Sequence, residues 1–493
     1  MIKEFRTLGK HALIYGAGFV LARAVGFLLL PLYTRYLTPE DYGAIELLDL
    51  TGFVLATFMT FGMDQAVMKY YHAWSDQSDR NRVLSTSIHF SVIGGLATIL
   101  LVAPFKELIA TYVLGSSKYS DLLYLSFVTL FVANLHKQEK TILRAQHRST
   151  LFTWVSVLYA AVAIGFNIYF LAWRGQGAAG IFYSTLVTST LFTVYLTWLI
   201  FKQTGIAFDV PKLREMVKYG IYFMPAGLAS FVLNWADRYF LRAYDTIEAV
   251  GLYALGYKIS MIVVLLIAVP FNQIWHSYIF EVEKQDNARE VYARVATYFL
   301  GFLTAVSLGI AVLGREIVII MAAPSFAGAA QVVPVLAAAM IFFCADNVFQ
   351  VGLLIKGHSN RLSSARWVAA VLNILLNWLL IPRYGMMGAA VATLLSFITS
   401  AVLIGYRAQK VYFVPFEYRR YAHMAAATVV PLGACLLLPE MQLWAAVLAK
   451  FCCWLIFPLT LLGTRFFSRA EWAGMQQLLA GIEWRAWRRR APA

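Results

Sequence analysis

The sequence predicts an all-helical (all-α) integral membrane protein with about fourteen transmembrane helices, arranged as two pseudo-symmetric six-helix lobes followed by two C-terminal helices. Three observations support this fold class: the hydrophobic content, the spacing of the apolar runs, and a repeat that relates the two halves. Of the 493 residues, 60% are hydrophobic, against roughly 45–50% in ordinary soluble domains. At about 20 residues per crossing, this content suffices for roughly fourteen helices. A soluble globular protein is thereby excluded.

Apolar runs of membrane length follow one another along almost the whole chain. Their approximate bounds are 11–33, 43–67, 83–105, 119–136, 149–173, 178–201, 216–241, 250–279, 294–314, 328–354, 362–382, 385–406, 421–439 and 441–464. The segments between these runs are too short to hold a soluble domain. The function of the protein is therefore predicted to lie in the bilayer.

The number of basic residues alternates from one connecting segment to the next. If the N-terminus is cytoplasmic, 30 of the 41 Lys and Arg residues fall in cytoplasmic segments and 7 in outward segments, and the others lie inside spans. Because cytoplasmic loops are enriched in Lys and Arg, both termini are predicted to be cytoplasmic. This placement also explains the net charge of +15, so nucleic acid is not predicted as a partner.

A repeat relates the two halves of the chain. The motif at 38–43 recurs at 246–251, and the motif at 177–180 recurs at 385–388, so that both pairs are separated by 208 positions. A repeat of six spans gives both copies the same orientation, as in transporters whose halves rock about a central site. The predicted divisions are lobe one (1–208), lobe two (209–415), two extra helices (416–464) and a cytoplasmic tail (465–493).

The predicted tail is amphipathic and basic. Trp472, Met475, Leu479 and Ile482 fall on one helical stripe, and a mixture of Trp and Arg follows them. This pattern is typical of a helix that lies in the membrane interface, where its cations meet anionic lipid. An anchor with no further role is the favoured interpretation.

Motifs typical of enzymes and metal sites are missing from suitable contexts. The four cysteines lie inside apolar runs, and no spacing of Cys and His suggests zinc. Hydrolase, nucleotide-binding and metalloprotease patterns do not occur where their chemistry could work. We therefore predict no enzyme activity, no metal site and no cofactor.

Ionisable residues inside the spans are few, and each costs at least about 2.5–3.5 kcal/mol in hydrocarbon unless it has a partner or a water-filled cavity. Arg23 lies near the middle of the first span. We expect it to line a cavity as a cation for an anionic substrate, with an ion pair to Asp49 as the alternative. Lys258 and Lys450 are explained equally well as cavity-lining cations or as side chains that snorkel to the outer interface.

A charged group also stands near the outer end of the seventh span. Asn234, Asp237 and Arg238 occupy positions i, i+3 and i+4 and so share one helix face. A local Asp–Arg network that closes an outer gate is the favoured interpretation. Direct contact of Arg238 with the substrate is the alternative.

Carboxylates in other spans are candidates for gating or for uptake of a coupling ion. Asp49 and Asp64 fall close to one stripe of the second span, and Asp346 lies in the tenth. For Asp64, a role in an inner gate or as a helix cap is favoured over proton uptake. Asp64 and Asp346 are nevertheless the candidate couplers if a proton or sodium gradient returns the empty carrier.

Amide side chains in two later spans are candidates for contact with a glycan. Asn347 and Gln350 lie in the tenth span, and Asn373 and Asn377 lie one helical turn apart in the eleventh. Hydrogen bonding between helices is the default explanation for such amides in a membrane protein. A glycan-facing role is the minority interpretation.

Residues 31–43, which read Pro-Leu-Tyr-Thr-Arg-Tyr-Leu-Thr-Pro-Glu-Asp-Tyr-Gly, closely resemble the polysaccharide transport family. This family comprises the O-antigen and oligosaccharide flippases of the multidrug/oligosaccharidyl-lipid/polysaccharide exporter superfamily. Supporting matches occur at 61–64, 69–71, 237–240, 251–259 and 377–385. The resemblance runs from residue 1 to about residue 410.

This resemblance implies a flippase that moves undecaprenyl-diphosphate-linked oligosaccharide repeat units to the outer leaflet of the bacterial cytoplasmic (inner) membrane. It implies a cationic cavity between the lobes and a groove for the lipid tail at the two extra helices. A lipid-linked oligosaccharide is then the main partner, and a polysaccharide polymerase and a chain-length protein are candidate partners.

The residues themselves agree with a negatively charged substrate. Arg23, helped by Lys258 and Lys450, would supply the cations that a diphosphate requires. A multidrug exporter of the same superfamily would present carboxylates instead, and Asp49 and Asp346 keep that alternative open. A flippase for a lipid-linked peptidoglycan precursor would use the same phosphate chemistry. A membrane scaffold without transport activity is the hypothesis from a different class.

Overall fold

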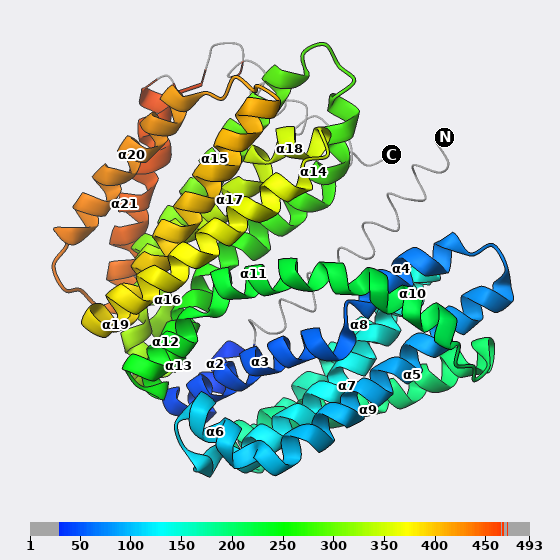
Figure 1. Ribbon diagram of the computed structural model, residues 1–493. Helices are drawn as coiled ribbons and strands as arrows, with labels where there is room; N and C mark the ends of the chain where they lie inside the picture. Colours follow the sequence, from blue (N-terminus) through cyan, green and yellow to red (C-terminus); the bar gives the residue numbers. More distant parts are fainter. Residues whose placement is uncertain (1–28, 465, 468–470, 472–493) are drawn as a thin grey trace, which may run out of the picture.

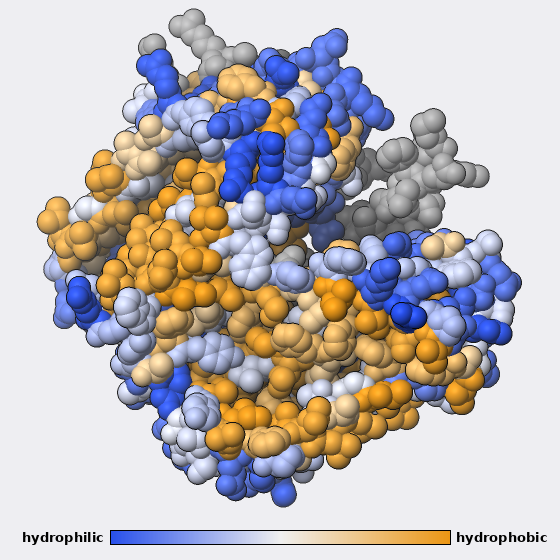
Figure 2. Space-filling view, viewed as in Figure 1, coloured by the Kyte–Doolittle hydropathy of each residue, from blue (hydrophilic) through white to orange (hydrophobic). Residues whose placement is uncertain are grey.

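The computed structural model describes residues 29–464, 466–467 and 471, and within these residues every regular element is a helix. Figure 1 shows two groups of helices that meet at one end and diverge toward the other. Figure 2 shows a broad apolar surface over both groups, with hydrophilic residues gathered near the helix ends. An apolar belt with polar ends is the surface that a bilayer requires.

Lobe one is built from the first described helices, drawn in blue to cyan in Figure 1. They are α2 (Leu30–Tyr36), α3 (Pro39–Thr60), α4 (Met63–Ala73), α5 (Gln77–Val102), α6 (Lys106–Leu114), α7 (Ser120–Ala145), α8 (Ser149–Ile168) and α9 (Gly177–Thr204). Helices α7 and α9 pack closely together, with α5 and α8 beside them.

Lobe two contains the helices drawn from green to yellow and orange. They are α10 (Val210–Gly220), α11 (Met224–Trp235), α12 (Asp237–Tyr244), α13 (Ile247–Ser260), the π-helix η5 (Val264–Ala268), α14 (Val269–Val282), α15 (Ala288–Val312), α16 (Gly314–Met321), the 3-10 helix η6 (Pro324–Gln331), α17 (Val333–Phe349), α18 (Val351–Ile355) and α19 (Ser359–Val411). The two C-terminal helices, α20 (Tyr418–Leu436) and α21 (Leu443–Gly463), pack on each other and on α15.

Ten helical segments of the described residues are long and apolar enough to cross a membrane. One of them, α19, is kinked at Gly385, whose φ of 50° interrupts the helix between two predicted spans. The all-helical membrane fold class is therefore confirmed, whereas the exact count of fourteen is not. Most of the first predicted span, with Arg23, and nearly all of the tail predicted to meet anionic lipid lie outside the described residues.

The helix of the fourth predicted span extends beyond the apolar run, which ends near residue 136. Helix α7 continues without interruption to Ala145. The run of polar residues after Leu135 resembles a loop in sequence, but His136, Gln138 and Glu139 are buried against neighbouring helices. Tertiary packing therefore extends the helix beyond the point where its hydropathy falls.

The two lobes meet where the two copies of the repeated motif contact each other. Thr38 and Thr246 cap α3 and α13 by accepting hydrogen bonds from backbone amides three residues later. A Cβ atom on Gly43 would lie 2.0 Å from the Ile247 carbonyl oxygen, and one on Gly251 would lie 2.0 Å from the Pro39 carbonyl oxygen. These reciprocal contacts show that only glycine allows the two helices to approach this closely. We call this meeting point the closed end.

Helices α10 to α12 pass from one lobe to the other. Helix α10 packs on α4 and α5 of lobe one, whereas α11 and α12 pack on α19 of lobe two. The end of α10 also lies close to the turn between α3 and α4, since a Cβ atom on Gly220 would lie 2.1 Å from the Phe61 carbonyl oxygen. The predicted lobe boundary near residue 208 stays a prediction. It assigns α10 to lobe two by its place in the chain, although α10 packs on α4 and α5 of lobe one.

Candidate functional site

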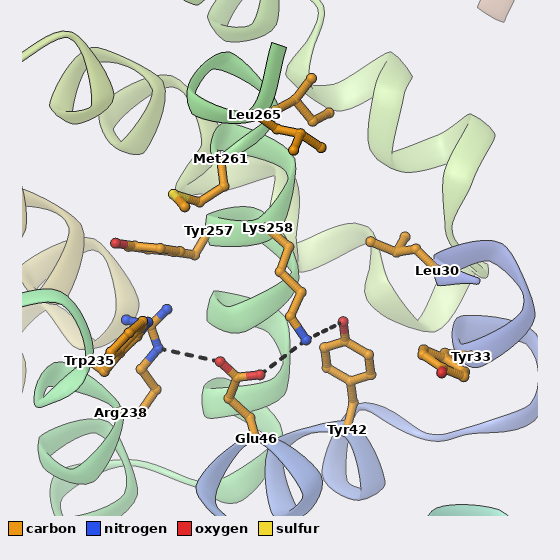
Figure 3. A pocket seen from close by; sticks show the side chains of 11 residues that line it. Leu30, Tyr33, Tyr42, Glu46, Trp235, Arg238, Tyr257, Lys258, Met261 and Leu265 are labelled. Carbon is orange, nitrogen blue, oxygen red and sulfur yellow. Dashed lines mark hydrogen bonds and ion pairs between the residues drawn. The ribbon is translucent and has the colours of Figure 1, made fainter. Parts of the chain in front are cut away.

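A cavity of about 450 Å³ lies between the lobes, next to the closed end. Helices α3 and α13 provide most of its polar wall, and α2 and α12 complete it (Figure 3). Its polar lining residues are Tyr33, Tyr42, Glu46, Arg238, Tyr257 and Lys258. Apolar side chains such as Trp235, Met261 and Leu265 line the remainder. A mainly apolar cavity with a few convergent polar groups is typical of a ligand site.

Glu46 of α3 stands between the two cations of the cavity, as Figure 3 shows. Its Oε2 lies 3.1 Å from Lys258 Nζ, and its Oε1 lies 3.9 Å from Arg238 Nε. Lys258 Nζ also donates a hydrogen bond of 3.0 Å to the hydroxyl of Tyr42. Because Lys258 and Arg238 come from lobe two and Glu46 comes from lobe one, these contacts join the lobes.

Arg238 is held rigidly from its own side. Its Nη1 donates to Asp237 Oδ1 at 2.7 Å and to the Asn234 carbonyl oxygen at 2.8 Å. The guanidinium lies over the ring of Tyr257, with its carbon 4.1 Å from the ring centroid. The Arg238 side chain is 1% exposed, and such burial requires these partners.

Asp237 completes the network inside lobe two. Its Oδ2 accepts hydrogen bonds from the hydroxyl of Tyr253 at 2.6 Å and of Thr393 at 3.2 Å. Asp237 is therefore satisfied by three side chains, including Arg238. The formal charges of Arg238, Lys258, Asp237 and Glu46 cancel, so an anion that binds to the cations would compete with the carboxylates.

Comparison with known proteins identifies the family. A family model described as "Polysaccharide biosynthesis protein" matches residues 32–331. The chain belongs to the polysaccharide biosynthesis protein family. The resemblance derived from the motif at 31–43 is confirmed by this match.

Curated relatives of this polysaccharide biosynthesis protein include archaeal and bacterial membrane proteins. It is 23% identical over 430 residues to the probable low-salt glycan biosynthesis flippase Agl15 of Haloferax volcanii, covering 85% of this chain and 86% of the relative. It is 24% identical over 290 residues to a membrane protein of Haemophilus influenzae, covering 57% of this chain and 68% of the relative.

Solved structures show the same fold. The lipid II flippase MurJ, in an inward closed conformation, matches with a TM-score of 0.75 at 15% identity, covering 90% of this chain and 98% of MurJ. An inward-facing multidrug resistance MATE transporter matches with a TM-score of 0.62 at 15% identity, covering 78% and 93%. The fold of the family member is thus that of MurJ and the MATE transporters.

Two of the four predicted substrate-binding cations, Lys258 and Arg238, line the central cavity. Lys450 does not: its Nζ lies 2.8 Å from Glu316 Oε1, in a separate pocket between α16, α20 and α21. This placement corrects the expectation that Lys450 would help to form the same cationic cavity. Arg23 lies outside the described residues, so its role stays a prediction.

The two predicted carboxylates of the second span have different surroundings. Asp64 lies 2.7 Å from Lys137 of α7, which links α4 to α7. Asp49 is exposed and forms no hydrogen bond or ion pair with any residue in the described part of the chain. The proposed pair with Arg23 lies outside the described residues.

Asp346 lines a second cavity, of about 340 Å³, that lies inside lobe two. Its Oδ2 accepts from Ser400 at 2.9 Å, and its Oδ1 has no hydrogen-bond partner among the described residues. Asn347 lines the same cavity. Asn373 and Asn377 are buried and bond to each other at 2.8 Å, and neither they nor Gln350 line this cavity or the central one.

Sequence reasoning missed Glu46, Tyr42 and Tyr257. Glu46 lies inside a predicted span, three residues before Asp49, and a carboxylate in that position signals a partner or a cavity. Because Glu46 was not among the predicted residues, the main feature of the site was missed. This feature is a carboxylate that is already paired with both cations.

Proposed function

We propose that this protein is a flippase that translocates undecaprenyl-diphosphate-linked oligosaccharide repeat units across the bacterial cytoplasmic (inner) membrane by alternating access. The exported glycan would serve as O-antigen, capsule or exopolysaccharide. The observation that carries the proposal is the pair of cations, Arg238 and Lys258, that faces a cavity between two lobes. The names of two relatives, both probable flippases, support it.

The diphosphate would bind by exchange with Glu46. Carboxylate and phosphate oxygens accept the same charge-assisted hydrogen bonds from Lys and Arg. Lys258 is the mobile partner, because its side chain is 47% exposed whereas that of Arg238 is 1% exposed. Lys258 would therefore turn from Glu46 to the phosphate, and Arg238 would receive it in a fixed geometry.

This exchange would connect substrate binding to movement of the lobes. The contacts of Glu46 with Lys258 and Arg238 hold lobe one against lobe two near the closed end. A substrate that replaces Glu46 removes these contacts and so favours opening of that end. A ligand shifts a conformational equilibrium only through such a difference in binding between the two states.

The positions of the basic residues orient the transporter with the closed end toward the outer side and both termini in the cytoplasm. The sugars would lie among the aromatic and polar side chains of the cavity. A groove of about 280 Å³ between α15, α17, α19 and α20 offers apolar surface for the lipid tail. A polysaccharide polymerase and a chain-length protein are the partners that would use the product.

A second candidate function is transport of a lipid-linked peptidoglycan precursor. The TM-score of 0.75 to MurJ favours this alternative over a multidrug exporter. Both lipid-linked substrates carry a diphosphate, so both would use the same cations. The two candidates differ in the glycan, which a flipping assay with each lipid would separate.

A flipping assay on variants tests the role of the cavity. The rate at which a fluorescent undecaprenyl-diphosphate oligosaccharide changes leaflet would be measured in proteoliposomes. Lys258→Gln should lower the rate by at least about tenfold, since it removes a charge-assisted contact. Lys118→Gln is the matched control, because Lys118 lies 2.9 Å from Glu40 in an exposed pair. Normal flipping by folded Lys258→Gln protein would contradict the proposal.

A further inference from the structure

A buried pair of titratable side chains lies inside lobe one, away from the central cavity. His136 and Glu139 stand one helical turn apart on α7, on the face that packs against α8 and α9. Glu139 is 0% exposed and His136 is 3% exposed. Neither residue contributes to the cavity that the proposed substrate would occupy.

The hydrogen bonding of this pair is incomplete. Glu139 Oε1 accepts from the hydroxyl of Thr197 on α9, and Oε2 has no hydrogen-bond partner among the described residues. Oε2 instead faces His136 Nδ1 at 3.9 Å. Neither ring nitrogen of His136 has a hydrogen-bond partner within the described ranges. Apart from the Thr197 hydroxyl at Oε1, two groups that can exchange a proton therefore face each other with no further hydrogen bond among the described residues.

The imidazole is oriented by packing alone. The ring of His136 stacks on the ring of Tyr159 from α8, with centroids 4.8 Å apart and an angle of 8° between the planes. The Tyr159 hydroxyl lies 2.9 Å from Ser189 Oγ of α9 and is thus occupied. Phe192 of α9 lies against both the His136 ring and the Tyr159 ring. The His136 ring is thus buried among aromatic side chains.

Charged groups on α7 and its two partners do not neutralise Glu139. Lys140 of α7 lies 5.9 Å from the centroids of the Phe152 and Tyr159 rings. Lys202 of α9 lies 5.1 Å from the ring of Trp198. Helix α8 presents Tyr159 as its titratable side chain.

The titratable groups on the other helices that pack against α7 have other partners or do not face Glu139. Asp64 of α4 is paired with Lys137. His89 of α5 lies against Phe201, and Glu46 of α3 is paired with Lys258. Asp49 of α3 is exposed. Within the described residues, the group that faces the second oxygen of Glu139 is therefore His136.

An ionised Glu139 beside a neutral His136 would be a buried charge with no cation as its partner and only threonine hydroxyls, those of Thr197 and Thr193, as nearby donors. Such a state is strongly disfavoured in an apolar interior. Either the carboxyl group keeps its proton, or the proton moves to the imidazole and forms an ion pair. Both forms contain the same number of protons, so the packed state of lobe one holds one proton at this pair.

We propose that His136 and Glu139 form a proton-binding site whose loss of a proton is coupled to rearrangement of lobe one. The step is release of one proton to water, which leaves a Glu139 carboxylate and a neutral His136. The carboxylate then requires hydration, which the packed α7, α8 and α9 do not supply. The proton-binding site itself does not depend on the proposed flippase function. Only the role of its proton in transport rests on that function.

The packing offers a route from this site to lobe two. Helix α7 carries Lys137, which holds Asp64 of α4 at 2.7 Å. Helix α4 packs on α10, the first helix of the segment that crosses to lobe two. A movement of α7 relative to α9 would therefore reach the crossing segment through α4.

Infrared spectroscopy tests the site without any substrate. Difference spectra of the membrane-reconstituted protein between about pH 5.5 and about pH 8 should contain the band of the protonated pair, which is the carbonyl band of a carboxylic acid if Glu139 holds the proton or an imidazolium band if His136 holds it. The band should disappear in Glu139→Gln and remain in Asp121→Asn, an exposed carboxylate on the same helix. Glu139→Asp keeps a carboxyl group and should keep a shifted band. An identical band in Glu139→Gln and in the unsubstituted protein would overturn the proposal.

A transport measurement tests the coupling. Flipping of a fluorescent undecaprenyl-diphosphate oligosaccharide would be compared with and without an imposed pH gradient. The gradient should accelerate flipping by the unsubstituted protein several-fold. The ratio of the flipping rates with and without the gradient should fall to about one in Glu139→Gln, since the amide cannot release a proton. Flipping without a gradient should continue.

The two measurements separate the failure of this proposal from the failure of the proposed function. If the unsubstituted protein shows the infrared band but does not flip the lipid, the proposed function is wrong and the proton-binding site stands. Gradient acceleration that persists in Glu139→Gln, or that is lost in Asp346→Asn alone, would overturn the role of the pair. Acceleration by sodium but not by protons would overturn it as well.

Discussion

Lobe one and lobe two each bury a carboxylate, and the two carboxylates are held in different ways. Asp237 of lobe two contacts Arg238, Tyr253 and Thr393 at 2.6–3.2 Å. Glu139 of lobe one has the hydroxyl of Thr197 and an unbonded histidine. The first arrangement fixes a negative charge beside a cation, whereas the second favours a state that keeps a proton. The comparison suggests that lobe two presents the charged binding site and that lobe one stores the proton.

The largest expected effect is on the stability of the protein, and it tests the difference between Asp237 and Glu139. Asp237→Asn leaves Arg238 buried without its main counter-ion and should lower the free energy of unfolding by about 3–5 kcal/mol. Glu139→Gln should leave it nearly unchanged, because the amide replaces a group that is already neutral or internally paired. Denaturation in detergent would measure both. Equal losses of stability in the two variants would contradict the distinction.

The next prediction concerns the closed end. Gly43→Ala places a Cβ atom 2.0 Å from the Ile247 carbonyl oxygen and should disfavour the closed end by about 1–3 kcal/mol. Spin labels at Glu40→Cys and Glu248→Cys would report the separation of the two motif copies, which should increase.

Gly165→Ala is the matched control for this experiment. Gly165 lies inside α8, and a Cβ atom added there would meet no atom within 4 Å, so the substitution should leave the separation unchanged. An unchanged distance in Gly43→Ala would show that the reciprocal contact does not close this end.

A smaller effect is expected for the carboxylate that occupies the cavity. Glu46→Gln frees Lys258 and Arg238 and should tighten binding of inorganic pyrophosphate by about tenfold, or about 1.4 kcal/mol. Titration calorimetry would measure this change, with Glu40→Gln at an exposed site as the control. Weaker pyrophosphate binding in Glu46→Gln would show that Glu46 does not compete with the anion.

The smallest effect on transport is expected for Lys450→Met. Lys450 is paired with Glu316 outside the central cavity, so the flipping rate per folded protein should change by less than about twofold. The protein should nevertheless unfold more easily, since Glu316 would be left buried without its cation. Loss of flipping at normal levels of folded protein would place Lys450 on the substrate path.

The sequence predicted those features that depend on local residue types. Thr38 and Thr246 of the repeated motif cap their helices, and capping depends on the residue type itself. The repeat predicted two related halves, but that its two copies contact each other was not predicted, because this contact depends on packing between distant segments. The helical spacing of Asn234, Asp237 and Arg238 predicted a local network, and Arg238 donates to Asp237 Oδ1 and to the Asn234 carbonyl oxygen. Which of the cations would share one cavity could not be predicted, because Lys450 and Lys258 have similar sequence surroundings but different tertiary partners.

Glu139 shows a second limit of the sequence. The polar run at 136–140 lowers the local hydropathy and so predicts the end of a span. The neighbouring α8 and α9 bury this run, and burial by distant segments is not contained in the local pattern. A carboxylate and a histidine three residues apart at a predicted span end are the signal that could have identified the pair.

The most direct test of the central claim is the flipping activity of the unsubstituted protein. Proteoliposomes would be loaded with a fluorescent undecaprenyl-diphosphate oligosaccharide, and the fraction accessible to a membrane-impermeant quencher would be followed over time. The account predicts exchange between leaflets well above protein-free vesicles, and suppression of that exchange by Lys258→Gln. Background exchange of the lipid, together with efflux of a cationic dye, would contradict the account and indicate a drug exporter.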